Sequence, residues 1–408
     1  MTDVVVTGLG ATTPLGGDVA STWAGLLAGR SGVRRLDNDW IDRYEMPVRI
    51  AAQLAVEPTE VLPRVEARRL DRSEQVAMVA AKQAYADAGL DEDAVDPERL
   101  AVIIGTGIGG ALTLLHQDDL LEVHGLRKVS PLTVPMLMPN GPAAHVGLAF
   151  AARAGVHAPV SACASGAEAL AWGWRMIKSG EADVVIAGGA EACITGITMA
   201  GFAQARTMST RNDAPEEASR PFDGQRDGFV LGEGAGILVL ERAEHAKARG
   251  SRIYARLAGI GTSADSYHIT GPDPEGTGQA RAINAALRSG GLAASDIGHV
   301  NCHATSTQVG DVIESVAVHK AIGDHPVLTA PKGSLGHLLG ASGAVESIAT
   351  VLTLRDGVIP PTANLRNPDP GMLHDVVADT PREVKLTAAV NDSFGFGGHN
   401  VALAFTPT

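Results

Sequence analysis

Aromatic residues are scarce in this chain, since Phe, Trp and Tyr together make up only 4% of its 408 residues. A core with so few rings has to be built from Val, Ile, Leu and Ala, while 48 glycines allow backbone segments to approach one another closely. Basic residues are also in deficit, with 33 Lys and Arg against 46 Asp and Glu and a net charge of −13. A nucleic-acid-binding protein needs a basic face, so this balance argues against nucleic acid as a partner.

Cysteine is rare, and the three present lie far apart: Cys163, Cys193 and Cys302. They form neither a disulfide framework nor a CxxC metal-binding pair, which favours a reducing compartment. Met1 leads directly into the apolar run at Val4 without a basic leader, and the most apolar long window, 184–205, is interrupted by glycines and Glu191. We therefore expect a cytoplasmic protein with no signal peptide and no membrane partner.

Short apolar runs alternate with Ala-rich or amphipathic segments along the whole chain. Strands are predicted at 4–6, 49–55, 100–105, 182–191, 235–241, 252–260 and 297–302. Helices are predicted at 18–28, 73–88, 164–177, 244–249 and 278–289, and from about residue 338. This alternation is typical of an α/β protein with largely buried strands.

Cys163 lies in the stretch Pro159-Val-Ser-Ala-Cys-Ala-Ser-Gly166, where a turn leads into the helix predicted at 164–177. Unpaired N–H groups at the start of a helix lower the pKa of a cysteine and favour the thiolate. The small residues after Cys163 would also let a substrate come close. The pattern indicates a nucleophile, and a buried structural cysteine is the alternative.

The chain also contains a sign of internal duplication. Residues 164–169, Ala-Ser-Gly-Ala-Glu-Ala, resemble residues 341–346, Ala-Ser-Gly-Ala-Val-Glu, and both open an Ala-rich segment. We therefore predict two related halves, 1–250 and 251–408, that face one another across one site.

Three later stretches carry further reactive groups. His303 follows a predicted strand, Lys332 and His337 are five residues apart, and a Gly-rich turn carries Phe394 and Phe396. Each group alone could be structural or exposed. Together with Cys163 they offer a thiol, two imidazoles, an ammonium and flexible N–H donors, which is a complete set for acyl transfer through a thioester.

With these motifs the chain resembles the β-ketoacyl-acyl carrier protein (ACP) synthases of the type II group, 3-oxoacyl-ACP synthase II, in the thiolase-like superfamily. The resemblance runs from Val4 to Phe405 and rests on four motifs: Ser161-Ala-Cys-Ala-Ser-Gly166, His303-Ala-Thr-Ser-Thr307, Lys332 with Gly336-His-Leu-Leu-Gly340, and Asn391-Asp-Ser-Phe-Gly-Phe-Gly-Gly398. The chain departs from the family pattern at Ala304, at Gln308 and in 331–334, and these changes leave the shape of the pocket and the pathway open.

The resemblance implies a duplicated α/β fold with five layers, α-β-α-β-α, in a homodimer. It also implies decarboxylative Claisen condensation of a Cys-bound acyl thioester with malonyl-ACP, which extends the chain by two carbons. The product would enter fatty acid or related polyketide-type biosynthesis. No cofactor is implied.

Roles for individual residues come from the same resemblance. Cys163 would carry the acyl group, with its own N–H and that of Phe396 as the oxyanion hole. His303 and His337 would bind the malonyl thioester carbonyl and stabilise the enolate as CO₂ leaves. Lys332 would orient the histidines. Glu314 would be the direct partner of Lys332, with Asp311 nearby in support. Phe394 and Phe396 would form an aromatic gate. The acyl pocket would be lined by Ile108, Thr305 and Thr307.

The resemblance also implies a surface that docks the carrier and a site that binds an ion. The basic residues expected to dock the acidic carrier are Arg68, Arg69, Arg127, Lys128 and Arg206. A structural monovalent cation would be held near Asn301, Glu346, Asn391 and Asp392.

Proteins with several other functions share part of this pattern of motifs or this fold. A ketosynthase of a specialised pathway is one alternative, and another is a non-catalytic chain-length partner subunit, which shares the fold but lacks the nucleophile that Cys163 supplies. A thiolase would carry a second cysteine near the Gly-rich turn, where His399 and Asn400 stand. A cysteine hydrolase would need a site for water, which the two histidines do not indicate.

Overall fold

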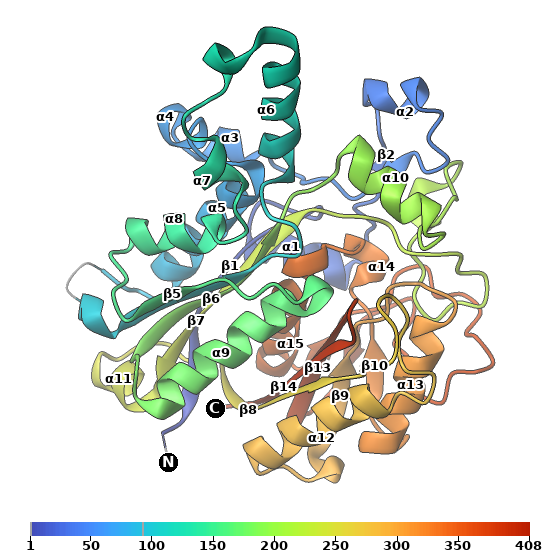
Figure 1. Ribbon diagram of the computed structural model, residues 1–408. Helices are drawn as coiled ribbons and strands as arrows, with labels where there is room; N and C mark the ends of the chain where they lie inside the picture. The colour runs from blue at the N-terminus through green and yellow to red at the C-terminus, as the bar shows by residue number, and fades with distance from the viewer. Residues whose placement is uncertain (1, 92–93) are drawn as a thin grey trace.

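The computed structural model describes residues 2–91 and 94–408 (Figure 1). Its strands are β1 (Val4–Thr12), β2 (Arg34–Arg35), β3 (Ile50–Ala51), β4 (Leu100–Gly105), β5 (Gly155–His157), β6 (Val184–Glu191), β7 (Gly234–Arg242), β8 (Ala255–Ala264), β9 (Ile297–Asn301), β10 (Val327–Thr329), β11 (Val358–Ile359), β12 (Arg382–Glu383), β13 (Ala388–Gly395) and β14 (His399–Thr406).

The α-helices are α1 (Val19–Leu27), α2 (Asp39–Arg43), α3 (Pro58–Val61), α4 (Arg64–Ala67), α5 (Arg72–Asp87), α6 (Ala111–His124), α7 (Thr133–Leu137), α8 (Gly141–Ala149), α9 (Ser165–Ser179), α10 (Gly196–Gln204), α11 (Ala243–Ala248), α12 (Thr277–Gly290), α13 (Gly310–Ala321), α14 (Lys332–Leu335) and α15 (Ser342–Asp356). Six 3-10 turns complete them: η1 (Pro97–Arg99), η2 (Leu126–Lys128), η3 (Ala162–Ala164), η4 (Pro215–Glu217), η5 (Ala294–Asp296) and η6 (Leu339–Ala341).

Ten strands form one mixed sheet in the order β10-β9-β13-β14-β8-β1-β7-β6-β4-β5. It divides into two halves of five strands with the same pattern, because β1-β7-β6-β4-β5 matches β8-β14-β13-β9-β10 in both order and direction. The halves meet at β1 and β8, where only Val5 and Val6 pair with Arg256 and Ala255. This repeat confirms the predicted duplicated fold.

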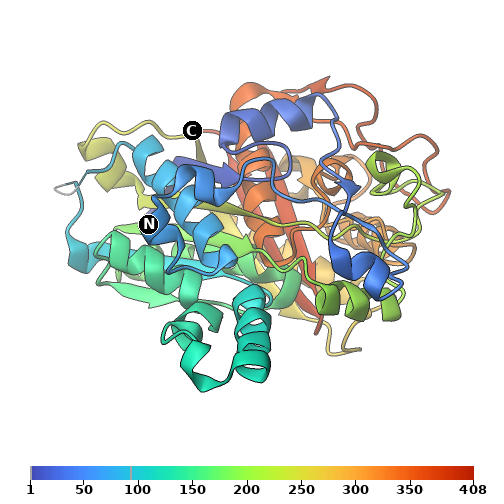
Figure 2. The same ribbon diagram turned by 90° about the horizontal axis from the view of Figure 1, so that it is seen from above.

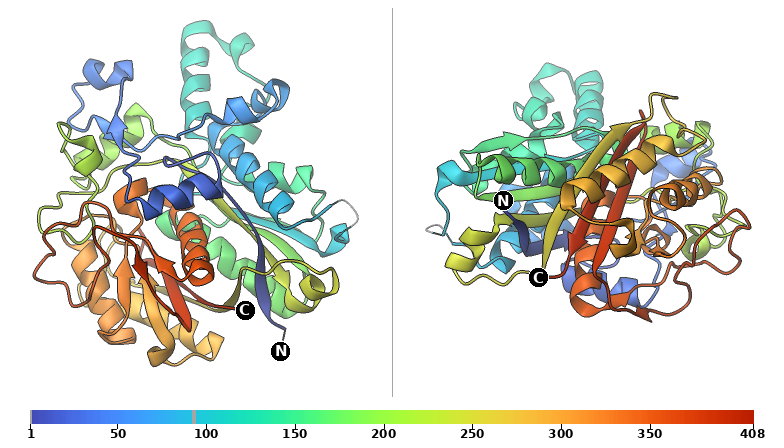
Figure 3. Two further views of the ribbon diagram at one scale, coloured as in Figure 1. Left: turned by 180° about the vertical axis from the view of Figure 1, so that it is seen from behind. Right: turned by 90° about the horizontal axis from the view of Figure 1, so that it is seen from below.

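Helices form layers on both faces of each half (Figure 1). Helices α5 and α8 cover the outer face of the first half, and α12 and α13 cover the outer face of the second. Helices α9 and α15 lie between the halves and contact both (Figure 3). The result is the predicted five layers, α-β-α-β-α, with the apolar core on both sides of the strands.

The two central helices are equivalent members of the repeat. Each follows a 3-10 turn, η3 before α9 and η6 before α15, and each is capped at its end by a glycine in the left-handed region, Gly180 and Gly357. The six-residue similarity seen in the sequence therefore marks corresponding positions in the two halves.

Some local predictions are wrong. The alternation at 49–55 yields only the two-residue strand β3, because beyond its short pairing with β2 this segment is held largely by single backbone contacts such as that from Ala52 to Leu231. The helix expected from about 338 begins at Ser342. The protruding segment with α6 and α7 was not predicted (Figure 2). The predicted boundary between residues 250 and 251 stays a prediction.

Within the described ranges, no helix combines the length and apolar character needed to cross a bilayer.

His299 gives one testable consequence of this core. It is fully buried in β9, neither ring nitrogen has a hydrogen-bond partner in the described part of the chain, and burial lowers its pKa to about 3. The unfolded chain takes up a proton on this ring below about pH 6.5, whereas the folded protein does not, so acid favours unfolding. We expect His299→Leu to reduce the loss of stability between pH 7.5 and pH 5 by about 2 kcal/mol, measured by denaturant unfolding. Equal losses in both proteins would refute this.

Candidate active site

Cys163 lies in η3, in the turn that leads into α9, as the sequence predicts. Ala162 before it has a positive φ of 51°, which turns the chain sharply at the thiol. Gly395 packs on this turn, where a Cβ atom would lie 2.6 Å from the Ser161 carbonyl oxygen. The absence of a side chain lets the backbone N–H of Phe396 come close to the sulfur, beside the N–H of Cys163 itself, and both groups lower the pKa of the thiol.

The predicted resting thiolate is nevertheless wrong. Burial raises the pKa of Cys163 to about 12, and the opposing effects of the Lys332 charge and of the two N–H groups are smaller. The position ahead of a helix therefore does not outweigh the removal of the sulfur from water. The resting group is a thiol, and it needs a neighbour to help it react.

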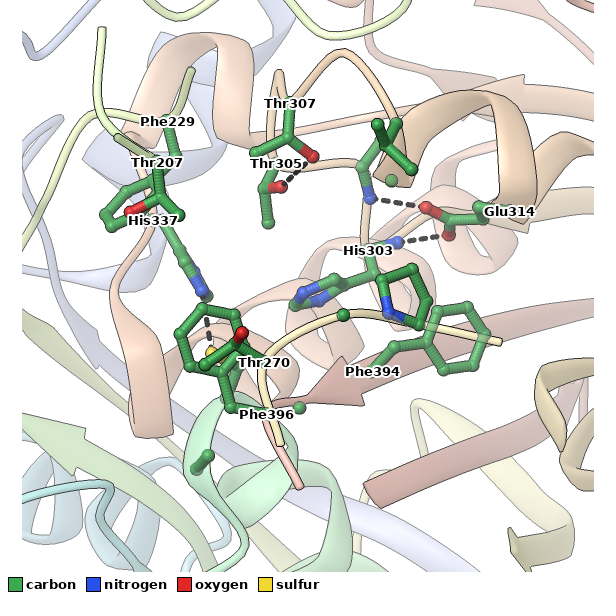
Figure 4. A pocket seen from close by; sticks show the side chains of 18 of the residues that line it. Thr207, Phe229, Thr270, His303, Thr305, Thr307, Glu314, His337, Phe394 and Phe396 are labelled. Atoms are coloured by element: carbon green, nitrogen blue, oxygen red, sulfur yellow. Dashed lines mark hydrogen bonds between the residues drawn. The ribbon is translucent and has the colours of Figure 1, made fainter. Parts of the chain in front are cut away.

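That neighbour is His337, which lies just after α14. Its backbone is held by the Val230 carbonyl, and Gly336 before it has a φ of 67°, a conformation suited to glycine. Its Nε2 lies 3.0 Å from the Cys163 Sγ, a contact that Figure 4 shows as a dashed line, and its Nδ1 lies 3.0 Å from the Ser342 Oγ.

His303 extends from the end of β9 toward the same point. Its backbone N–H donates to Glu314 Oε1 at 2.6 Å and to Asp392 Oδ1 at 2.8 Å. Its ring lies edge-on to that of His337, with 5.3 Å between the ring centres (Figure 4). The two imidazoles and the thiol thus converge from three separate segments of the chain.

Both imidazoles are neutral at physiological pH. Burial lowers the pKa of His303 and of His337 well below the usual value, and the nearby Lys332 charge lowers both further. A neutral imidazole carries one N–H and one lone pair, so each ring can donate a hydrogen bond without carrying charge.

Lys332 forms a buried ion pair with Glu346, and each side chain is only 1% exposed. The predicted pairing of Lys332 with Glu314 is wrong. The Glu314 oxygens instead accept the backbone N–H groups of His303 and Ala304, so Glu314 holds the loop after β9. Both carboxyls are buried, which raises the pKa of Glu346 to about 7 and that of Glu314 well above its usual value.

Asp311 lies away from the reacting groups. It accepts the backbone N–H of Phe222 and lies 3.5 Å from Arg226, and it does not line the cavity described below. Its position one turn before Glu314 in α13 places it under the 219–229 loop, so it supports that loop rather than Lys332.

The thiol and both histidines open into one cavity of about 520 Å³ (Figure 4). Of the residues named from the sequence, it is lined by Ile108, Thr305, Thr307, Glu314, Arg206, Phe394 and Phe396. Sequence reasoning missed Phe202, Phe229, Leu339 and Thr270, which also line it. Phe229 ends the polar, turn-rich stretch 219–229, and only its place as an apolar residue there could have indicated a role.

The two aromatic residues of the Gly-rich turn have different environments. Phe394 is buried with its ring 6.0 Å from that of His303, whereas Phe396 is 36% exposed and lies 6.5 Å from Phe202. Gly397 and Gly398 after it both have positive φ. Phe396 therefore stands over the thiol at the start of a turn that only glycines readily adopt.

The basic residues named for carrier docking are all exposed. Arg68 and Arg69 follow α4, Arg127 and Lys128 lie in η2 after α6, and Arg206 follows α10 at the edge of the cavity. Helices α4, α6 and α10 lie toward one end of the molecule (Figure 1). Of the five residues, only Arg206 lines the cavity.

The oxygen atoms expected to hold a monovalent cation belong to residues of β9, β13 and α15. Asn301 and Asn391 are register partners on β9 and β13, and their amide nitrogens donate to carbonyl oxygens of α15. Their Oδ1 atoms, together with Glu346 Oε2 and Asp392 Oδ2, are buried without hydrogen-bond partners in the described residues. Unpartnered carbonyl and carboxylate oxygens are the donors that hard cations take.

Comparison with known proteins agrees with this geometry. Residues 1–246 match the family model "Beta-ketoacyl synthase, N-terminal domain" and residues 254–366 match "Beta-ketoacyl synthase, C-terminal domain". The 3-oxoacyl-[acyl-carrier-protein] synthase 2 of Mycobacterium tuberculosis (strain ATCC 25618 / H37Rv) is 51% identical over 404 residues, which cover 98% of this chain and 96% of that protein.

Two solved structures share the whole fold. A beta-ketoacyl synthase from Burkholderia phymatum STM815 is 36% identical with a TM-score of 0.93, and the alignment covers 100% of both chains. A chain of "AntDE:AntF (apo): type II PKS acyl-carrier protein in complex with its ketosynthase bound to the hexaketide" is 30% identical with a TM-score of 0.92, over 100% of this chain and 99% of that one.

Proposed function

This chain belongs to the beta-ketoacyl synthase family, and we propose that Cys163, His303 and His337 are the groups that carry out its reaction. The protein is an acyltransferase, a β-ketoacyl-ACP synthase, which condenses an acyl thioester with malonyl-ACP in fatty acid synthesis. One observation supports the residue roles above all others: the Cys163 sulfur lies 3.0 Å from His337 Nε2, beside the His303 ring, at one cavity.

In the first half-reaction the Cys163 sulfur attacks the carbonyl carbon of the acyl thioester. The bond from that carbon to the carrier sulfur then breaks, and the proton lost by Cys163 ends on the departing sulfur, so one thiol replaces another. The N–H groups of Cys163 and Phe396, which both lie close to the sulfur, would donate hydrogen bonds to the oxygen that becomes negative in between. His337 stabilises the sulfur as it loses its proton.

In the second half-reaction the malonyl group loses CO₂. The electron pair of the broken C–C bond moves to the thioester carbonyl oxygen, where His303 and His337 donate hydrogen bonds to the enolate. Neutral imidazoles suit this role because each offers an N–H, and no cationic acid is required. The enolate carbon attacks the acyl thioester, and Cys163 leaves as a thiolate that is reprotonated.

A direct test is condensation of an acyl-ACP with malonyl-ACP by the purified protein, with and without iodoacetamide. We expect a product two carbons longer, and loss of both activity and reactive thiol after alkylation. An active protein that contains alkylated Cys163 would refute the role of this residue. A purified protein that forms no product from these substrates even without iodoacetamide would leave the non-catalytic partner subunit as the better description.

Phe396 is proposed as a gate that shields the thiol and orders acyl entry before malonyl entry. Phe396→Ala is expected to lower condensation more than it lowers acylation, because the exposed ring of Phe396 lies over the site that the second substrate must reach. Intact-protein mass spectrometry measures acylation, and product analysis measures condensation. A proportional fall in both rates would show that the ring only packs against its neighbours.

The proposed carrier-docking surface is defined by Arg68, Arg69, Arg127, Lys128 and Arg206. An acidic carrier meets a chain of net charge −13, so local basic residues must offset the repulsion. Charge reversal at Arg127 and Lys128 is expected to raise KM for acyl-ACP several-fold and to leave acyl-pantetheine unaffected. The matched control is Arg288→Glu, an exposed charge on α12 at the opposite end (Figure 1). Equal effects on both substrates would contradict docking.

A homodimer is proposed through the β5 end of the sheet. Strand β5 is an edge strand, and apolar side chains are exposed around it: Leu148, Val156 and Val160. A second copy that adds its own β5 would satisfy the free backbone groups and cover this surface. Light scattering on the intact protein tests this, and a monomer at micromolar concentration would contradict it.

Two further expectations also stay proposals. If a monovalent cation binds, the oxygen atoms of Asn301, Glu346, Asn391 and Asp392 would hold it and it would offset part of the buried negative charge. An unchanged melting temperature when potassium replaces tetramethylammonium would argue against it. A cytoplasmic location is proposed from the three unpaired cysteines, and cell fractionation would test it.

A further inference from the structure

Both ring nitrogens of His337 have a partner. Nε2 lies 3.0 Å from Cys163 Sγ, and Nδ1 lies 3.0 Å from the hydroxyl oxygen of Ser342. Ser342 is the first residue of α15 and is 1% exposed, and this hydroxyl has no other hydrogen bond among the residues described. By contrast, Nδ1 of His303 is buried without a partner in the same part of the chain.

The tautomer of His337 decides whether it can stabilise an enolate. A neutral imidazole has one N–H, and only a proton on Nε2 points at the side where the substrate and the thiol meet. That tautomer leaves a lone pair on Nδ1, which then needs a donor because the ring is buried. The Ser342 hydroxyl lies at hydrogen-bond distance from this nitrogen.

The position of Ser342 also fixes the direction of its hydroxyl. The N-terminus of α15 carries a partial positive charge from its unpaired N–H groups. This field favours an orientation in which the oxygen of the Ser342 hydroxyl faces the helix and its hydrogen points away from the helix. His337 is the hydrogen-bond partner on the side to which this hydrogen points. A serine at this end of a fifteen-residue helix is therefore a better donor to Nδ1 than an acceptor from it.

We propose that Ser342 is a positioning residue that donates to His337 Nδ1 and so holds His337 in the tautomer that presents Nε2–H to the malonyl carbonyl. The proposal rests on the proposed function, because it assigns His337 to decarboxylation. Ser342 gives up no proton in the cycle. The electron pair from the broken C–C bond goes to the carbonyl oxygen, and the proton of Nε2 stays on its nitrogen and only donates a hydrogen bond.

The experiment uses malonyl-ACP decarboxylation in a Cys163→Gln background, where no acyl transfer can interfere. Ser342→Ala is expected to slow CO₂ release about tenfold, as the loss of one buried hydrogen bond would. Ser342→Thr keeps the hydroxyl and is expected to restore most of the rate. The matched control is Thr353→Val, which removes a buried, unpartnered hydroxyl from the same helix and should leave the rate unchanged. Thermal unfolding of each variant monitors folding.

A second background separates this role from a structural one. If Ser342 acts through His337, Ser342→Ala should cause no further loss once His337→Ala is present. An additional tenfold loss there, or an unchanged rate in the first background, would overturn the proposal. A different result would contradict the proposed function itself: if His337 had no role in decarboxylation, His337→Ala alone would leave the rate of CO₂ release unchanged.

Discussion

His303→Ala is expected to slow decarboxylation of malonyl-ACP by roughly two to three powers of ten while Cys163 is still acylated at a nearly normal rate. The reason is that its ring offers a donor to the enolate, whereas the hydrogen bond to the thiol among the described residues is made with His337 and not with His303. His337→Ala should lose decarboxylation to a similar extent and also slow acylation, because Nε2 lies 3.0 Å from Sγ and the thiol pKa is high.

Cys163→Gln should show the opposite behaviour and release CO₂ without forming a condensed product. Intact-protein mass spectrometry measures acylation and trapped CO₂ measures decarboxylation, so the two half-reactions are read separately. The assignment of roles is wrong if both histidine variants resist acylation yet still decarboxylate malonyl-ACP.

Removal of the Lys332 charge is expected to lower condensation by at least two powers of ten and the free energy of unfolding by about 3 kcal/mol. This side chain forms a buried ion pair with Glu346, and its charge lowers the pKa of Cys163 and of both catalytic histidines. Lys332→Met therefore leaves an unpaired buried carboxylate and also weakens the thiol as a nucleophile. Denaturant unfolding and steady-state condensation measure the two effects.

The pH dependence of this variant has a definite sign. Burial raises the folded-state pKa of Glu346, so its neutral form is favoured in the fold and its ionisation destabilises the protein as pH rises. Without the lysine, the deficit in stability should be larger at pH 8 than at pH 6. Adding Glu346→Gln should restore part of the stability and little of the activity. A double variant less stable than Lys332→Met would contradict the ion-pair account.

The sequence predicted the fold well, because its signals come from residues whose neighbours lie nearby in the chain. Apolar runs such as Val4–Val6 gave strands, and the similarity between 164–169 and 341–346 marked the equivalent helices α9 and α15. Motif resemblance also named the three groups that the structure brings together, Cys163, His303 and His337.

Predictions that depended on which distant groups meet were less successful. The family resemblance named Glu314 as the partner of Lys332, but Glu346 on α15 takes that position. The thiol pKa was misjudged because a helix start is visible in a sequence, whereas burial of the sulfur by Leu339 and the Gly-rich turn is not. Ser342 lies five residues after His337, inside the repeated stretch 341–346, but the repeat did not indicate that its hydroxyl would meet the His337 ring.

Gly340 sets the spacing between the two halves at the site. A Cβ atom on Gly166 would lie 2.7 Å from the Gly340 carbonyl oxygen, and one on Gly189 would lie 2.3 Å from it. Because both residues are glycines, the first turn of α9 can rest on the backbone of η6. Main-chain contacts therefore contribute to the distance between Cys163 and His337, and the Phe229 ring, which packs edge-on to His337 with 5.5 Å between the ring centres, supports it as well. Cavity residues such as Ile108 and Phe202, which are not part of these contacts, can consequently vary with less effect on that spacing. Acyl-chain preference and chemical competence can therefore evolve as separate traits, and the pocket can be redesigned for another chain length without rebuilding the catalytic centre.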